Sequence, residues 1–287
     1  MIDIKPLGES FGAEISGVDL STELDEASFR AIERAYADHS VLLLRGQKLS
    51  DARHVEFSRR FGELEIHVLR EYVNPDHPEL YRISNIIENG KRIGIPDAGN
   101  YWHTDLSYTA VPSRGSIMHA HRIPHRDGKP LGDTSFCSTA AAYDALPDDL
   151  KRRIAGLRAV HRFWDRYLAE RKKAGQQVEV SAERRAQTPD VVHPLVRTHP
   201  VSGRKVLFVN EGFTISVLGL PEDESKQLLQ TLYGYVSSPG NVYRHSWKVG
   251  DVVMWDNWAT QHRLNVDYRP DEPRFMQRTT LVGSSAF

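Results

Sequence analysis

The stretch Asn100-Tyr101-Trp102-His103-Thr104-Asp105 puts an imidazole and a carboxylate two residues apart. On a β-strand, side chains two residues apart lie on the same face, so we expect a strand here that points His103 and Asp105 the same way. A second imidazole would complete a set that binds one metal ion and leaves positions open for other ligands. His262, at the end of the stretch 255–262, is the candidate. Taken alone, His-x-Asp is more often a chance surface pair, because short motifs match by accident.

Two arginines follow His262. Arg274 and Arg278 are separated by an even number of residues, so both should lie on one face of a strand. They could be solvent-facing residues of an edge strand. They could also be a pair of carboxylate clamps, because the planar guanidinium matches a carboxylate with two parallel hydrogen bonds. The residues themselves leave both interpretations open.

Composition limits the class of protein. The chain has 287 residues, 40% of them hydrophobic, and a formal net charge of −1, with no basic excess for binding nucleic acid. No apolar run is long enough to span a membrane, and the first residues do not resemble a signal peptide. We therefore expect no nucleic-acid or membrane partner and a cytoplasmic location. The single cysteine, Cys137, allows no internal disulfide and is expected to be a small buried core residue.

Hydrophobic spacing predicts helices at 24–39, 50–61, 140–146, 147–156 and 222–236. It predicts two short strands within 2–18 and further strands at 40–46, 80–84, 116–121, 132–136, 192–197, 205–209, 242–247, 252–256 and 275–282. The continuous apolar run at 40–46 indicates burial on both faces, and Asn89-Gly90 indicates a hairpin turn. Many short strands with a few helices favour a β-sandwich or open barrel over a parallel α/β sheet. No break divides the chain, so we expect one domain, residues 1–287.

The segment 162–190 is rich in charged residues and poor in apolar ones. Its composition cannot form a core of its own. Two interpretations stay open: a solvated helix followed by a linker, or a mobile lid over a binding site.

Ten short blocks stand in a fixed order along nearly the whole chain. They are GAEISGVDL (12–20), FGEL (61–64), WHTD (102–105), GDT (132–134), AYDAL (142–146), HPLVRTHP (193–200), FVNEGFT (208–214), WDN (255–257), QH (261–262) and RFMQR (274–278). Together they closely resemble the taurine dioxygenase and 2,4-dichlorophenoxyacetate dioxygenase family of Fe(II)/2-oxoglutarate enzymes. Each block alone is a weak signal, but their order makes the resemblance specific.

The resemblance implies a mainly β fold with flanking helices, the double-stranded β-helix or jelly roll. It implies an enzyme that uses Fe(II), 2-oxoglutarate and O2 to hydroxylate a small organic anion, with release of succinate and CO2. By position, iron would be held by His103, Asp105 and His262, and the distal carboxylate of 2-oxoglutarate by Arg274 and Thr134. The positions that match the family's substrate pocket are Arg278, His67, Phe213 and Phe163, and the lid would cover about 163–190.

Departures from the taurine enzyme leave the substrate open. Tyr101, Arg70 and Gln277 differ from the residues at the matching positions. Tyr101 and Arg70 could add donors for a larger or doubly anionic substrate, so sulfonates, aryloxyacetates and N-substituted amino acids all remain candidates. Arg70 could equally face the solvent. A catalytically weak jelly-roll sensor of a small anion is the alternative function, which the intact set of metal and carboxylate residues disfavours. A homo-oligomer also stays open.

Overall fold

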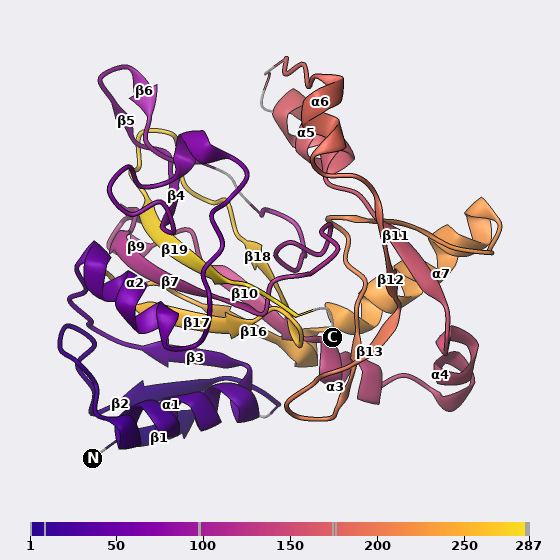
Figure 1. The fold of residues 1–287 in the computed structure, drawn as a ribbon, viewed down its shortest axis with the longest axis horizontal. Helices are drawn as coiled ribbons and strands as arrows, with labels where there is room; N and C mark the ends of the chain where they lie inside the picture. Colours follow the sequence, from indigo (N-terminus) through magenta and orange to yellow (C-terminus); the bar gives the residue numbers. More distant parts are fainter. Residues whose placement is uncertain (1, 9, 97–98, 174, 176, 285–287) are drawn as a thin grey trace.

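A seven-stranded sheet forms the base of the fold, in a computed structural model that describes residues 2–8, 10–96, 99–173, 175 and 177–284 (Figure 1). Neighbouring strands are antiparallel except for the second and third, which are parallel. In spatial order the strands are β1 (Asp3–Pro6), β2 (Ala13–Ser16), β3 (Val41–Leu44), β17 (Val252–Asp256), β7 (Gly115–Arg122), β19 (Phe275–Leu281) and β4 (Tyr81–Ser84).

Two helices cover one face of this sheet. Helix α1 (Glu26–His39) begins at Asp25, whose side chain accepts a hydrogen bond from the Ser28 N–H, and α2 (Asp51–Arg59) begins at Ser50 in the same way. Their buried faces pack on the sheet in one apolar cluster that includes Phe29, Ile32 and Leu42. The predictions of helices at 24–39 and 50–61 are confirmed, with ends shifted by one or two residues.

The other face of the sheet packs against a second, three-stranded sheet. It consists of β16 (Val242–His245), β10 (Thr134–Ser138) and β18 (Thr260–Leu264). A cluster that includes Val41, Phe136 and Trp255 fills the space between the sheets. All residues of β3 are buried, which confirms the burial on both faces predicted from its continuous apolar run.

A third region lies at the right of Figure 1. Helix α7 (Glu222–Val236) and the short helices α3 (Thr139–Asp144) and α4 (Asp148–Ile154) pack there with small sheets around one apolar cluster. The sheets are β12 (Val191–Pro194), β11 (Arg158–His161) and β15 (Thr214–Val217), and the pair β13 (Val196–Thr198) and β14 (Lys205–Leu207). The prediction of one strand at 192–197 is wrong: the chain changes sheets at the fully buried Leu195, because β12 pairs with β11 and β13 pairs with β14.

Two helices project from the body at the top of Figure 1: α5 (Trp164–Lys173) and α6 (Ala182–Ala186). The shorter elements are η1 (Arg70–Tyr72), η2 (Pro239–Asn241) and the strand pairs β5 (Ile87–Glu88) with β6 (Lys91–Arg92) and β8 (His125–Arg126) with β9 (Lys129–Pro130). The hairpin predicted at Asn89-Gly90 is confirmed, with both residues at positive φ.

The coarse fold prediction, mostly sheet with some helices, is confirmed. Cys137 is fully buried in the core, as predicted. Among the described residues, no helix is both long and apolar enough to cross a membrane.

Candidate active site

His103 and Asp105 do not lie on a regular strand, so that prediction is wrong. His103 forms only an isolated bridge with His262, and Asp105 lies in the turn that follows. The backbone N–H of His103 donates to the His262 carbonyl over 3.1 Å, and the return bond is 2.9 Å. The Thr104 hydroxyl donates to the carbonyl of Thr260. These bonds attach the segment to β18. The two side chains converge because the chain turns after His103, not because of strand alternation.

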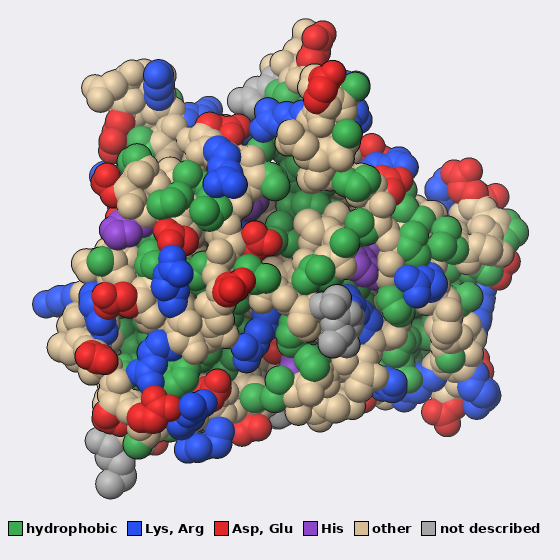
Figure 2. Space-filling model, in the orientation of Figure 1, with side chains coloured by type: hydrophobic (Ala, Val, Ile, Leu, Met, Phe, Trp, Pro, Cys, Tyr) green, Lys and Arg blue, Asp and Glu red, His purple; other side chains and the backbone are tan. Residues whose placement is uncertain are grey.

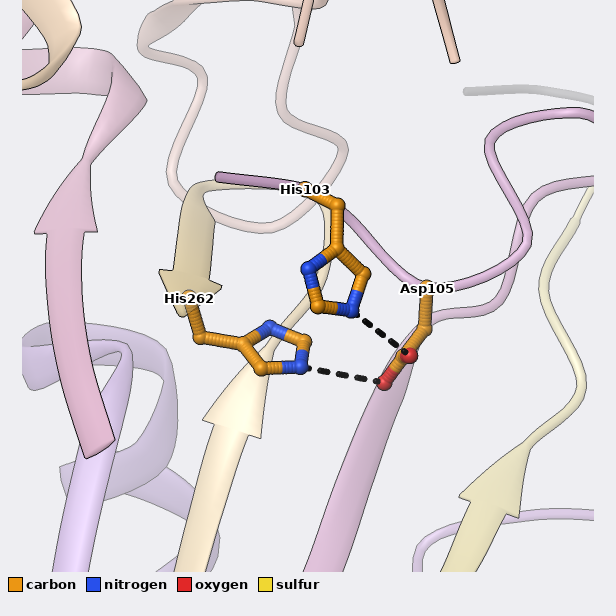
Figure 3. A group of neighbouring side chains, drawn as sticks. All are labelled: His103, Asp105 and His262. Atoms are coloured by element: carbon orange, nitrogen blue, oxygen red, sulfur yellow. Dashed lines mark ion pairs between the residues drawn. The ribbon is translucent and has the colours of Figure 1, made fainter. Parts of the chain in front are cut away.

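The two imidazoles and the carboxylate point toward one another (Figure 3). His103 Nε2 lies 3.7 Å from Asp105 Oδ1, and His262 Nε2 lies 3.9 Å from Asp105 Oδ2. One donor atom from each residue lies within 4.8 Å of the other two, and all three residues are buried. Within the described part of the chain, this is the only group of three such side chains close enough to hold a metal ion.

Neighbouring residues orient these groups. His103 Nδ1 lies 2.9 Å from the Tyr101 carbonyl, so the protonated Nδ1 donates and Nε2 keeps its lone pair. The Ser116 hydroxyl donates to Asp105 Oδ2 over 2.8 Å, and Asn257 donates to the same hydroxyl oxygen. The arrangement presents neutral imidazole nitrogens and a hydrogen-bonded carboxylate to one point.

The charge states also suit a metal site. Burial lowers the pKa of both His103 and His262, so both imidazoles are neutral at neutral pH. Burial alone would raise the pKa of the Asp105 carboxyl, but Arg278 and then the two histidines outweigh it and hold that pKa below its usual value. Two neutral imidazoles with one carboxylate form the donor set that non-haem iron(II) takes, with open positions for other ligands.

A cavity opens at this group. Its walls are largely aromatic: Tyr101, Tyr108, Phe163, Tyr167 and Phe213. Tyr108 packs against Phe163 and Phe213, with ring centroids 4.6 and 4.7 Å away. Figure 2 shows the surface hollowed below α5 and α6, with hydrophobic side chains gathered there. The other lining residues are Leu69, Tyr81, Ile83, Ile95, Gly99, Leu106, Met118, Glu170, Arg171 and Leu264, with the predicted residues discussed below.

Arg274 and Thr134 both line the cavity. Arg274 is buried, its Nε has no hydrogen-bond partner, and no carboxylate of the described residues pairs with it. Burial lowers its pKa from the usual value. A buried guanidinium without an anion is costly, so the arrangement fits a ligand carboxylate. The Thr134 hydroxyl accepts from Trp247 Nε1 over 2.9 Å and still has its own proton to donate.

Arg278 faces the same cavity as Arg274, which agrees with the predicted strand spacing. Its Nη1 donates to Asp105 Oδ1 over 2.7 Å, while its Nε is buried without a partner. The solvent-facing interpretation of the two arginines is therefore wrong, since both are buried. No sequence pattern indicated that Arg278 would also contact the candidate metal ligand.

The remaining predicted residues divide into two groups. His67, Tyr101, Phe163 and Phe213 line the cavity. Burial, followed by the charge of Arg278, lowers the pKa of His67 to about 3, so its ring is neutral. Arg70 is exposed at the start of η1 and is not among the lining residues, which favours the solvent-facing alternative.

Sequence reasoning missed Tyr108 and Tyr167 as wall residues. Tyr167 could have been predicted from the sequence, because it follows Phe163 by one helical turn and lies on the same face. Tyr108 was not, because it lies in an irregular segment after the metal-ligand candidates.

Comparison with known proteins decides the family. The family model described as taurine catabolism dioxygenase TauD, TfdA family matches residues 3–280. The chain belongs to this family. The 2,4-dichlorophenoxyacetate dioxygenase of Cupriavidus pinatubonensis, named as alpha-ketoglutarate-dependent, is 39% identical over 90% of both chains.

Two solved structures agree with this family membership. A taurine dioxygenase from Burkholderia xenovorans has a TM-score of 0.79 and 35% identity, covering 99% of this chain and 91% of its own. The protein AAD-2, solved with Mn(II) and N-oxalylglycine, has a TM-score of 0.81 and 30% identity, covering 99% of this chain and 98% of its own. This TauD/TfdA member is a 2-oxoglutarate-dependent dioxygenase that requires Fe(II), 2-oxoglutarate and O2, and the sensor alternative is disfavoured.

Proposed function

We propose that His103, Asp105 and His262 hold the iron, and that the enzyme hydroxylates a small organic anion with an aryl group, of the aryloxyacetate type. The observation that carries the proposal is the aromatic-walled cavity that these three residues and two buried arginines share. When bound, iron, 2-oxoglutarate and O2 would supply the oxidising chemistry: one oxygen atom of O2 goes to the substrate, which converts C–H to C–OH, and the other goes to succinate, which forms from 2-oxoglutarate with loss of CO2. The protein contributes by positioning 2-oxoglutarate and the substrate.

Each remaining polar residue then has a separate task. Arg274 pairs with the distal carboxylate of 2-oxoglutarate, and Thr134 donates its hydroxyl proton to the same group. Arg278 binds the substrate anion with the N–H groups that Asp105 does not use. Since Arg278 also holds Asp105, an anion that binds there lies next to the metal ligands. His67, neutral at neutral pH, borders this part of the cavity without adding charge.

The walls support an aryl-bearing substrate over a short aliphatic one. Tyr108, Phe163 and Phe213 present rings to the cavity in edge-to-face and tilted arrangements, which suit another aromatic ring. The Cupriavidus relative is named for 2,4-dichlorophenoxyacetate, whereas the Burkholderia structure is named for taurine. Sulfonates and N-substituted amino acids are the competing classes.

We also propose that the two facing sheets form a double-stranded β-helix and that residues 1–287 make one domain. The packing of the sheets around one core supports this. The segment at about 163–190 would act as a lid, because Phe163 and Tyr167 line the cavity from it.

The test is a screen for succinate release by protein loaded with Fe(II) and 2-oxoglutarate. The compounds are 2,4-dichlorophenoxyacetate, taurine, an N-carboxymethyl amino acid and 2,4-dichloroanisole, a neutral compound with the same ring. We expect the aryloxyacetate to stimulate succinate release most strongly and the neutral compound not at all. Equal stimulation by the anisole would refute the requirement for an anionic group on the substrate. The absence of succinate with every compound would refute the proposed substrate class.

A further inference from the structure

Helix α5 forms one wall of the cavity. Phe163, just before its first residue, and Tyr167, Glu170 and Arg171 within it all line the space. Since the helix projects from the body of the fold, the shape of the cavity depends on what holds α5 in place (Figure 1).

The two carboxylate oxygens of Glu170 contact different parts of the structure, one the helix α5 itself and the other the body of the fold. Its Oε1 lies 2.9 Å from Lys173 Nζ and 3.3 Å from Arg166 Nε, both within α5. Its Oε2 accepts a hydrogen bond of 3.1 Å from Asn100 Nδ2, three residues before His103. The residue is buried although its neighbours in the sequence are charged. The bond from Asn100, which is itself exposed, joins this carboxylate to a residue outside its own helix. A hydrogen bond to a charged group contributes more than one between neutral groups.

A second contact reaches the adjacent residue. The guanidinium of Arg166 lies 4.0 Å from the centre of the Tyr101 ring, within the range of a cation–π interaction. The carbonyl of the same Tyr101 accepts the hydrogen bond from His103 Nδ1. The helix therefore docks on the two residues that lead into the first candidate metal ligand, and one of them orients that ligand.

We propose that Glu170 is a positioning residue that fixes α5 to Asn100, so that Phe163 and Tyr167 face the substrate beside the iron. The inference rests on the proposed function for its catalytic consequence, but not for the attachment itself. Opening of α5 would enlarge the cavity and release its aromatic wall. The attachment should therefore govern substrate binding more than the binding of 2-oxoglutarate, which the proposed function assigns to Arg274, a residue outside α5.

The attachment is tested first by hydrogen exchange of metal-free protein, in peptides that cover 163–173. Asn100→Ala and Glu170→Ala should each speed exchange there about tenfold, as expected for a hydrogen bond to a charged group. The double variant should exchange no faster than Glu170→Ala, because the two substitutions remove the same hydrogen bond. Glu170→Gln, which keeps an acceptor oxygen, should fall between wild type and Glu170→Ala.

The matched control is Glu71→Gln. It removes the ion pair between Glu71 of η1 and Arg184 of α6, in which both side chains are about half exposed. Such exposed ion pairs contribute little to stability, so the rate of hydrogen exchange in 163–173 should change by less than about threefold. Additive effects of Asn100→Ala and Glu170→Ala, or unchanged exchange in both, would overturn the attachment.

The catalytic consequence is tested on the holoenzyme by succinate release stimulated by 2,4-dichlorophenoxyacetate. Asn100→Ala should raise the KM for this acid about tenfold, with kcat and the KM for 2-oxoglutarate changed by less than twofold. A purely structural role would lower kcat and thermal stability together, and that result would overturn the positioning role. If no acid stimulates succinate release in wild type, the substrate proposal fails while the exchange experiment still decides the attachment.

Discussion

The backbones of His103 and His262 hydrogen-bond to each other in both directions, in an isolated antiparallel bridge. The bridge joins an irregular segment to strand β18, and the two imidazole centroids lie 4.2 Å apart as a result. The candidate metal centre is therefore held by main-chain bonds between distant parts of the chain. Side-chain substitution can remove a ligand without removing this bridge.

The first prediction follows because the ligand side chains can be replaced without breaking the backbone bridge. His103→Ala, Asp105→Ala and His262→Ala should each lower Fe(II) binding by at least tenfold and abolish succinate formation, because two protein donors hold the ion poorly against water. The measurement is metal content after dialysis, with circular dichroism to check the fold. His125→Ala, at an exposed histidine, is the control and should keep one iron per chain. Wild-type iron content in all three ligand variants would show that the metal lies elsewhere.

The second prediction concerns Arg274. Arg274→Lys should raise the KM for 2-oxoglutarate by about tenfold or more, because lysine cannot form two parallel bonds and a charge-assisted hydrogen bond contributes roughly 1.5–3 kcal/mol. The measurement is succinate formation at varied 2-oxoglutarate. An unchanged KM would show that Arg274 does not bind the distal carboxylate of 2-oxoglutarate.

Gly132 provides a third prediction that leaves Arg274 intact. A Cβ at Gly132 would lie 2.9 Å from Arg274 Nε, so Gly132→Ala should displace the guanidinium and raise the KM for 2-oxoglutarate. Gly128 has the same φ of +76°, but a Cβ added there would meet nothing within 4 Å, so Gly128→Ala carries the same backbone strain without the contact. Equal effects of the two substitutions would mean that strain, not the contact with Arg274, is responsible.

The fourth prediction separates the two contacts of Arg278. Arg278→Gln should abolish coupled hydroxylation while a slow, uncoupled loss of 2-oxoglutarate persists, because the substrate anion loses its partner. Since the same side chain donates to Asp105, Mn(II) affinity should change as well. The readouts are the ratio of product to succinate and Mn(II) titration of the variant. Full coupling in Arg278→Gln would exclude a role for Arg278 in substrate binding.

The fifth prediction is a pH dependence of stability. Burial, then His193 and Arg197, lowers the pKa of the fully buried His161 to about 3. Between about pH 6.5 and 3 the unfolded chain binds a proton at this histidine and the folded chain does not, so stability falls as the pH falls, by about 1.4 kcal/mol per unit. Urea unfolding of metal-free protein from pH 7 to 5 measures the slope. His161→Asn should reduce it, and His125→Asn, which removes an exposed histidine, should not.

Local patterns determined much of the secondary structure. Helix α7 and strand β17 begin and end where hydrophobic spacing predicts, at Glu222–Val236 and Val252–Asp256. The order of short motifs also identified the family and the candidate ligands. Helix periodicity depends on residues three and four apart, so the chain itself carries that information.

Only the tertiary structure decided how distant residues meet. The bend that points Asp105 at His103, the change of sheets at Leu195 and the bond from Asn100 to Glu170 all join segments with no common sequence pattern. The pairing of Arg278 with Asp105 is of the same kind, because it depends on where β19 lies beside β7. Such contacts arise from the packing of whole strands and helices, in which the position of one side chain follows from the register of many others.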